Sequence, residues 1–169
     1  LSGVGGQGIL SIATVIGKAA LKEGLYMKQA EVHGMSQRGG SVVTYVKYGS
    51  EVCSPVVEKG EADIIISFEQ LEAARYVSYL KKGGHIITST QQIDPMPVIT
   101  GAAVYPEDII GKLKAEGVDV IAVDALALAE QAGTAKASNV VLMGVVSTKM
   151  AFDEDVWQKA LENCVPAKF

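Results

Sequence analysis

Short apolar runs alternate along the chain with segments whose apolar residues recur at helical spacing. The segment 9–23 is the clearest helix, because its apolar positions fall on one face at a period of 3.6 residues. Gly24 suits its end, since glycine accepts the left-handed cap conformation. The remaining pattern predicts helices over 71–80, 106–116, 125–132, 138–150 and 153–161, and strands over 26–30, 62–68, 85–90 and 118–123. This alternation predicts an α/β fold, a three-layer Rossmann-like sandwich.

Three features refine the predicted sheet. The runs 41–48 and 52–57 flank Gly49-Ser50 and predict an antiparallel hairpin, so we expect a mixed, mostly parallel sheet. Gly83-Gly84 is expected to end a helix, and 98–104 is expected to form one or two short edge strands. Pro106 is expected to open a helix, and Ser138 and Asn139 to cap one. No repeat or linker interrupts the chain, which predicts a single domain over 1–169.

A glycine cluster precedes the first predicted helix, with the sequence Gly3-Val4-Gly5-Gly6-Gln7-Gly8. A strand normally precedes such a turn, so we expect a few N-terminal residues to be missing before Leu1. The Gly-x-Gly-x-x-Gly spacing permits a tight turn, and the amides at a helix start attract phosphate. Glu31 follows the second predicted strand, the position of a ribose-binding acid in dinucleotide sites. The pattern leaves open an anion, cofactor or subunit contact, or simply close packing of a helix on a sheet.

Composition excludes several classes of function. The chain has 169 residues, 49% of them hydrophobic, and a formal net charge of −4 without a basic stripe, which argues against nucleic acid and anionic membranes. No stretch of about 18 apolar residues predicts a membrane span. The two cysteines, Cys53 and Cys164, cannot by themselves complete a four-cysteine iron–sulfur cluster or a structural zinc site. We expect two reduced thiols in a cytoplasmic protein.

The segment 31–41, Glu-Val-His-Gly-Met-Ser-Gln-Arg-Gly-Gly-Ser, is more specific. Together with the glycine cluster it closely resembles the small subunits of the indolepyruvate ferredoxin oxidoreductase family, within the gamma domains of 2-oxoacid:acceptor oxidoreductases. The resemblance continues through 54–57, 59–63, 68–73, 75–76, 97–98 and 139–144, and so spans essentially the whole chain. The family normally continues past Phe169, so we expect the domain to be clipped at both ends.

The resemblance implies a role as a subunit. In this family a large partner carries thiamine diphosphate and [4Fe–4S] clusters, and the complex decarboxylates a 2-oxoacid such as indolepyruvate, reduces ferredoxin and releases an acyl-CoA. It implies that this chain shapes the site and contacts coenzyme A, with no catalytic or metal-binding residue of its own. The expected contacts are Gly3, Gly5, Gly6, Gln7, Gly8, Ser36, Gln37, Arg38, Gly39 and Gly40. Two rival hypotheses remain, an independent NAD(P)- or flavin-binding oxidoreductase and a pure scaffolding module.

Local chemistry is consistent with such contacts and offers other candidates. Arg38 presents a planar fork of donors suited to phosphate or carboxylate, although an ion pair within the chain or with a partner is equally consistent. His33 is a possible proton donor or a structural hydrogen-bonding residue. Glu69 and Glu72 follow an apolar strand, as does Asp124. The first two suit either acid–base chemistry or the first turn of a helix, and Asp124 suits helix capping.

Overall fold

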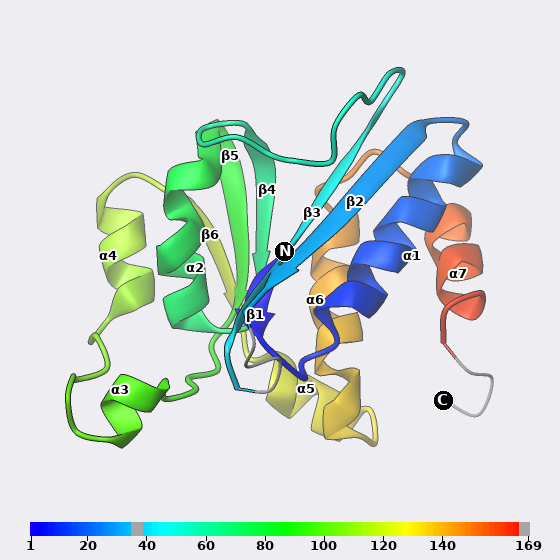
Figure 1. Ribbon diagram of the computed structural model, residues 1–169. Helices are drawn as coiled ribbons and strands as arrows, with labels where there is room; N and C mark the ends of the chain where they lie inside the picture. The colour runs from blue at the N-terminus through cyan, green and yellow to red at the C-terminus, as the bar shows by residue number, and fades with distance from the viewer. Residues whose placement is uncertain (35–38, 166–169) are drawn as a thin grey trace.

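The computed structural model describes residues 1–34 and 39–165, which form a six-stranded sheet with helices on both faces (Figure 1). The strands are β1 (Ser2–Val4), β2 (Tyr26–His33), β3 (Ser41–Gly49), β4 (Ala62–Ser67), β5 (Leu80–Ser89) and β6 (Asp119–Val123). Their order across the sheet is β2-β3-β1-β4-β5-β6. Strands β1, β4, β5 and β6 run parallel, whereas β3 is antiparallel to both β1 and β2. The predicted mixed, mostly parallel sheet is therefore confirmed.

The helices divide into two layers that complete the predicted sandwich. They are α1 (Ile9–Lys22), α2 (Gln70–Tyr76), α3 (Met96–Ile99), α4 (Ile109–Ala115), α5 (Ala125–Gln131), α6 (Ser138–Ser147) and α7 (Glu154–Glu162), with 3₁₀ turns at Val77–Tyr79 and Ala135–Ala137. Figure 1 shows α2 and α4 on one side of the sheet and α1, α6 and α7 on the other. Among the described residues, no helix combines the length and apolarity needed to cross a membrane.

Two apolar cores follow from the alternation of side chains along the central strands. Ile66 and Ile87 pack into the core beneath α1, α6 and α7, whereas Ile65 and Ile86 pack into the core beneath α2 and α4. Strands covered on both faces read as continuous apolar runs, and for that reason the sequence identified β4. Burying each of these isoleucines contributes about 1.5–3 kcal/mol to folding.

The predicted pairing of 41–48 with 52–57 is wrong, because β3 has a different partner strand. β3 pairs with β2 in an eight-residue register from Tyr26↔Gly49 to His33↔Val42, and 52–57 contains no strand. Pro55 supplies no backbone donor, which disfavours a ladder in that segment. β2 offers a longer continuous partner, so the hairpin is closed through the segment 34–40 and not through Gly49-Ser50.

Other boundaries differ from the predictions for local reasons. The segment 98–104 forms no edge strand, because Pro95 precedes a short helix, α3, stabilised by bonds such as Ile99 N to Pro95 O at 3.1 Å. Pro106 does not open α4, which begins three residues later. Asp108 caps that helix by accepting from Gly111 N at 3.1 Å.

Two more predictions at element ends are wrong. Gly83-Gly84 does not end a helix but lies inside β5, which already begins at Leu80. Neither Ser138 nor Asn139 caps α6. Ala137 occupies the N-cap position without a side-chain bond, and Asn139 Oδ1 accepts from the next amide, Val140 N, at 2.8 Å.

Gly84 generates a prediction about the sheet. A Cβ there would lie 2.8 Å from Asp63 O and 3.1 Å from Ala62 O, backbone atoms that cannot move aside. We expect Gly84→Ala to lower the free energy of unfolding by about 1–3 kcal/mol, as overpacking does. Urea denaturation measures this. The control is Gly49→Ala, whose Cβ would have its nearest neighbour at 3.8 Å. An equal effect of the two substitutions would contradict the packing argument.

Candidate functional site

The glycine turn joins β1 to α1 and adopts conformations that require glycine. Gly6 has φ 106°, and Gly8 is the N-cap of α1 with φ 76°. Side chains disfavour this left-handed region, so both positions restrict the residue to glycine. The first amides of α1 have no partner within the helix. The turn therefore presents backbone N–H donors, and a ligand can approach its backbone closely because the glycines have no side chains.

Gln7 holds the turn against the sheet. Its Oε1 accepts from Val4 N at 2.8 Å, and its Nε2 donates to Phe68 O at 2.9 Å and to Gln91 Oε1 at 3.2 Å. Phe68 follows β4 and Gln91 follows β5. The predicted ligand contact at Gln7 thus has its amide bonded within the chain, where it fixes the turn to the carboxyl ends of two strands.

The two predicted segments come together although Gly5 and Gly39 lie 34 positions apart in the sequence. Gly5 N donates to Gly40 O at 2.9 Å, and Gly39 N donates to Gly5 O at 3.4 Å. Gly39 also has a left-handed φ, 78°. The other predicted contacts of this segment, Ser36, Gln37 and Arg38, lie outside the described residues.

A hollow of about 310 Å³ lies in front of the turn. It is lined by Gly5, Gly6, Gly8, Ile9, Leu10, Glu31, His33 and Val42. The turn supplies amide donors to it and β2 supplies a carboxylate and an imidazole. The hollow can accept a small polar group at the start of α1, with the Glu31 carboxylate disfavouring anions on its own side.

The remaining glycines of the cluster serve different purposes. A Cβ on Gly3 would lie 2.7 Å from Gln7 Oε1 and 3.0 Å from both Ile9 Cδ1 and Phe68 Cβ. A Cβ on Gly8 would collide with Asn139 Nδ2, whereas a Cβ on Gly6 would have no atom of residues 1–34 and 39–165 within 4 Å. The packing explanation therefore holds for Gly3 and in part for Gly8, while Gly6 is free for a ligand to approach.

Glu69 is buried, 1% exposed, and caps α2. Its carboxylate accepts from Glu72 N at 2.9 Å, from Ile93 N at 3.3 Å and from the Tyr105 hydroxyl. Burial, and then the neighbouring Glu69, raise the pKa of Tyr105. The chain's own donors occupy both oxygens of Glu69, so the geometry fits the helix-start interpretation better than acid–base chemistry. Asp124 likewise caps α5, accepting from Ala127 N at 3.0 Å, which confirms its predicted role.

Glu72 ties α2 to the start of β3. Its Oε2 accepts from Ser41 Oγ at 2.5 Å, and its Oε1 accepts from Arg75 Nη1 at 2.8 Å. Burial raises the pKa of Glu72, partly opposed by these two donors. Ser41 directly follows Gly40, so Glu72 anchors the backbone that pairs with the glycine turn. Sequence reasoning missed this link because nothing local relates Glu72 to a serine 31 residues away.

The cysteines and histidines form no second site. Cys53 is exposed and Cys164 half-buried, and both are free thiols. Within residues 1–34 and 39–165, no three histidine, cysteine or acidic side chains gather as metal ligands. His33 lies at the hollow, and its Nδ1 is 3.1 Å from Gly34 O.

Comparison with known proteins gives a consistent result. The family model for pyruvate ferredoxin/flavodoxin oxidoreductase matches residues 1–169. The chain is 44% identical to indolepyruvate oxidoreductase subunit IorB of Thermococcus kodakarensis, over 99% of this chain and 86% of that protein. It is 46% identical to the Pyrococcus horikoshii subunit of the same name, over 90% of this chain and 77% of that protein.

Solved structures share the fold at low sequence identity. Pyruvate oxidoreductase subunit PORC of Thermotoga maritima superposes with a TM-score of 0.71 at 18% identity, over 99% of this chain and 84% of that one. A 2-oxoglutarate:ferredoxin oxidoreductase of Magnetococcus marinus, solved with 2-oxoglutarate, coenzyme A and succinyl-CoA bound, gives 0.69 at 20% identity, over 96% of this chain and 26% of that one. At these identities the likeness shows a shared fold and nothing more.

The raised pKa of Glu72 predicts a pH dependence of stability. The folded chain keeps this proton to higher pH than the unfolded chain does, so the stabilisation is complete below the unfolded pKa and is lost as pH rises through the folded pKa. Glu72→Gln keeps an acceptor oxygen but does not titrate. The free energy of unfolding of the variant, relative to the parent chain, should therefore rise as the pH increases above the ordinary glutamate pKa of about 4.3.

Urea denaturation at several pH values checks this, with Glu130→Gln as an exposed control. A variant whose stability runs parallel to that of the parent chain at every pH would show that Glu72 titrates alike in both states.

Proposed function

Because the chain belongs to the pyruvate ferredoxin/flavodoxin oxidoreductase family, we propose that it is a subunit of a 2-oxoacid:ferredoxin oxidoreductase of the indolepyruvate type. Two relatives that are 44% and 46% identical over nearly the whole chain bear the name indolepyruvate oxidoreductase subunit, which supports this type. The oxoacid in this proposal is indolepyruvate or another arylpyruvate, and the electron acceptor of the complex is ferredoxin.

The chemistry of this chain favours a division of labour between subunits. A [4Fe–4S] cluster needs four thiolates, and the whole sequence supplies Cys53 and Cys164 alone. The buried carboxylates Glu69 and Glu72 are bonded within the chain. In the proposal, the thiamine diphosphate and the clusters therefore lie on a large partner subunit. This chain contributes a wall of the site and a binding surface.

The hollow at the glycine turn is the observation that carries a coenzyme A contact. The open approach at Gly6, the amides at the start of α1 and the adjoining Gly39-Gly40 backbone fit a phosphate-bearing ligand. Arg38 immediately precedes this backbone and would add a permanent cation with a planar fork. Glu31 also lines the hollow, where its carboxylate suits a hydroxyl or amide donor and disfavours a second phosphate. The 2-oxoglutarate:ferredoxin oxidoreductase that shares this fold was solved with coenzyme A bound, which is consistent with coenzyme A as the ligand in this proposal.

The rival function, independent NAD(P) or flavin binding, fits the geometry less well. In a dinucleotide site the acid ends the parallel strand next to β1, reached through the first helix. Here the strand that follows α1 is β2, which does not pair with β1, because β1 lies between the antiparallel β3 and the parallel β4. Glu31 lies within this edge strand β2, opposite Thr44. The glycine spacing therefore occurs without the strand arrangement that gives the fingerprint its meaning.

The subunit proposal predicts that the isolated chain is colourless and does not turn over 2-oxoacids. Anaerobic purification, a visible spectrum and an assay with ferredoxin check this. Co-expression with a thiamine- and cluster-bearing large subunit should yield a stable complex that is active with indolepyruvate. Stoichiometric iron and turnover in this chain alone would overturn the division of labour, and tight NAD(P) or flavin binding would favour the rival.

The coenzyme A contact predicts a selective effect of replacing Arg38. Losing a charge-assisted contact costs about 1.5–3 kcal/mol, so Arg38→Ala should raise the apparent KM for coenzyme A by roughly 10- to 150-fold. The KM for the oxoacid should change little. Arg38→Lys keeps the charge but loses the planar fork, so it should rescue only part of the effect.

The exposed lysine variant Lys114→Ala, on α4, controls for loss of a surface charge. Dissociation of the Arg38→Ala complex at lower concentration, with an unchanged KM, would reassign Arg38 to the partner interface. Unchanged kinetics and assembly would remove both roles.

A further inference from the structure

An exposed apolar patch lies on the segment 93–105, between β5 and α4. Three of the four most exposed large apolar side chains in the described part of the chain fall within nine positions of this segment: Met96 at 65%, Ile99 at 66% and Val104 at 87% exposure. Met96 and Ile99 are neighbours on α3, because they lie three positions apart. Ala103 N donates to Pro97 O at 2.9 Å, which brings Val104 beside the same helix. The three side chains therefore form one surface, the α3 patch.

The chain fixes the backbone that carries the α3 patch. One oxygen of the buried Glu69, Oε1, accepts from Ile93 N at 3.3 Å and from the Tyr105 hydroxyl. Both ends of the segment are thus bonded to a single atom. Between them, Val98 N donates to Pro95 O at 2.8 Å. The apolar side chains are therefore held out in solvent by an ordered backbone, and a partner that covers them meets a preorganised surface.

Carboxylates border the α3 patch in sequence on both sides. Asp94 and Glu107 are exposed, and neither forms an ion pair with any residue of 1–34 or 39–165. The sequence has no lysine, arginine or histidine between His85 and Lys112. The patch is therefore apolar at its centre and negatively charged at its rim.

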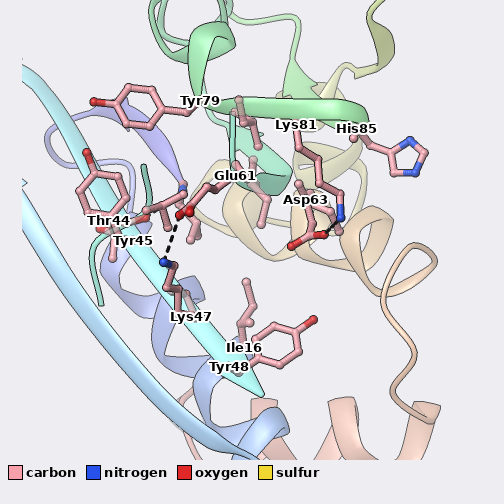
Figure 2. A pocket seen from close by; sticks show the side chains of 18 of the residues that line it. Ile16, Thr44, Tyr45, Lys47, Tyr48, Glu61, Asp63, Tyr79, Lys81 and His85 are labelled. Carbon is pink, nitrogen blue, oxygen red and sulfur yellow. Dashed lines mark hydrogen bonds and ion pairs between the residues drawn. The ribbon is translucent and has the colours of Figure 1, made fainter. Parts of the chain in front are cut away.

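Carboxylates at the opposite edge of the sheet, where β4 and β5 begin, have cations of their own. Lys47 pairs with Glu61 at 3.2 Å, and Lys81 pairs with Asp63, as Figure 2 shows. A cation from another molecule would have to compete with these lysines. At the α3 patch it can approach the carboxylates without displacing an internal partner.

The α3 patch lies at the edge of the sheet that carries the glycine turn. Figure 1 shows α3 beyond the carboxyl ends of β4 and β5, at the same end of the sheet as the turn between β1 and α1. The two are also linked through side chains, because Gln7 Nε2 of the turn donates to Gln91 Oε1 at 3.2 Å, two positions before Ile93. A large molecule that covers the turn can therefore also reach the patch.

A second copy of this chain suits the α3 patch poorly. In a two-fold dimer both chains contribute the same surface, so the Asp94 and Glu107 carboxylates of both copies would gather at one interface. Like charges brought together at an interface lower affinity, and each copy carries a formal net charge of −4. An apolar surface bordered by lysine or arginine avoids this repulsion.

We propose that the α3 patch is the surface on which the large partner subunit docks, through an apolar surface bordered by lysine or arginine side chains. This inference rests on the proposed function, because it names a contact surface of that complex. Ile99 and Val104 are the apolar anchors that the partner covers. Asp94 and Glu107 attract the partner's cations at the rim, which speeds association and sets the orientation of the two subunits.

Binding of the purified chain to the large thiamine- and cluster-bearing subunit, measured anaerobically by titration, tests the anchors. The double variant Ile99→Ser/Val104→Ser should bind at least about 30-fold more weakly than the parent chain, because two large apolar side chains are no longer buried. Leu21→Ser is the matched control, since Leu21 is 54% exposed near the end of α1 and should leave the affinity unchanged. The isolated variants should keep the Tm of the parent chain to within about 2 °C, because the replaced side chains are exposed.

The rim charges have a separate test. The double variant Asp94→Lys/Glu107→Lys should associate with the large subunit at least about threefold more slowly at low salt, and the difference should shrink as salt screens the charges. Glu23→Lys, an exposed carboxylate after α1, is the control and should associate at the rate of the parent chain. Equal association rates of all three chains at low salt would remove the role of the rim.

Hydrogen exchange tests the same surface without any substitution. Exchange over 96–104 should slow at least about fivefold when the parent chain binds the large subunit, and exchange over 20–25 should not change. Unchanged exchange over 96–104 in the complex would overturn the inference, and so would equal binding of the parent chain and the Ile99→Ser/Val104→Ser variant. In both cases the complex still forms and the proposed function stands.

Two further outcomes distinguish the occupants. Self-association of the isolated chain that Ile99→Ser/Val104→Ser abolishes would assign the α3 patch to a second copy and overturn the inference. Failure of the parent chain itself to bind the large subunit would overturn the proposed function, and this inference with it.

Discussion

The pairing of β1 with two neighbours of opposite direction is the constraint on which the rest of the structure depends. Three residues, Ser2–Val4, join the antiparallel pair β2–β3 to the parallel strands β4, β5 and β6. The same strand delivers the chain into the glycine turn and then into α1. The residues that line the hollow come from the turn, from the start of α1, and from β2 and β3.

The junction also explains why the turn and the Gly39-Gly40 backbone meet. β3 starts at Ser41, opposite Val4, so the residues just before β3 must lie beside those just after β1. The bonds of Gly5 with Gly40 and Gly39 continue the ladder beyond the ends of both strands. Glu72 then fixes Ser41 from the other layer of the sandwich. The site is thus assembled from sheet register and one buried carboxylate.

Sequence reasoning succeeded where a local pattern carried the information. The period of 3.6 residues over α1 and the continuous apolar run of β4 each reflect burial of particular faces. It failed where two partners competed over distance. The segment after Gly49 could form only a short hairpin with β3. β2 pairs with β3 instead, because its eight-residue ladder satisfies more backbone hydrogen-bonding groups.

The candidate site divides in the same way. The glycine turn was predictable, since spacing and residue type encode its φ angles and its place before a helix. The bond of Ser41 to Glu72 and the bonds of Gln7 to Phe68 and Gln91 were not predictable, because they join positions 31 to 84 residues apart. Such contacts depend on the register of the finished sheet, and a single sequence contains no local trace of it.

The hydrogen bonds that Gln7 and Gly40 make to the glycine turn affect the conformational entropy of ligand binding. Fixing the backbone of one residue costs about 1–2 kcal/mol of conformational entropy, and glycine loses more of this freedom than any other residue. Here the Gln7 side chain and the bonds of Gly5 with Gly39 and Gly40 fix the turn from within the chain. That ordering is completed when the chain folds, so a group that binds at Gly6 meets a preorganised surface and retains more of its interaction free energy.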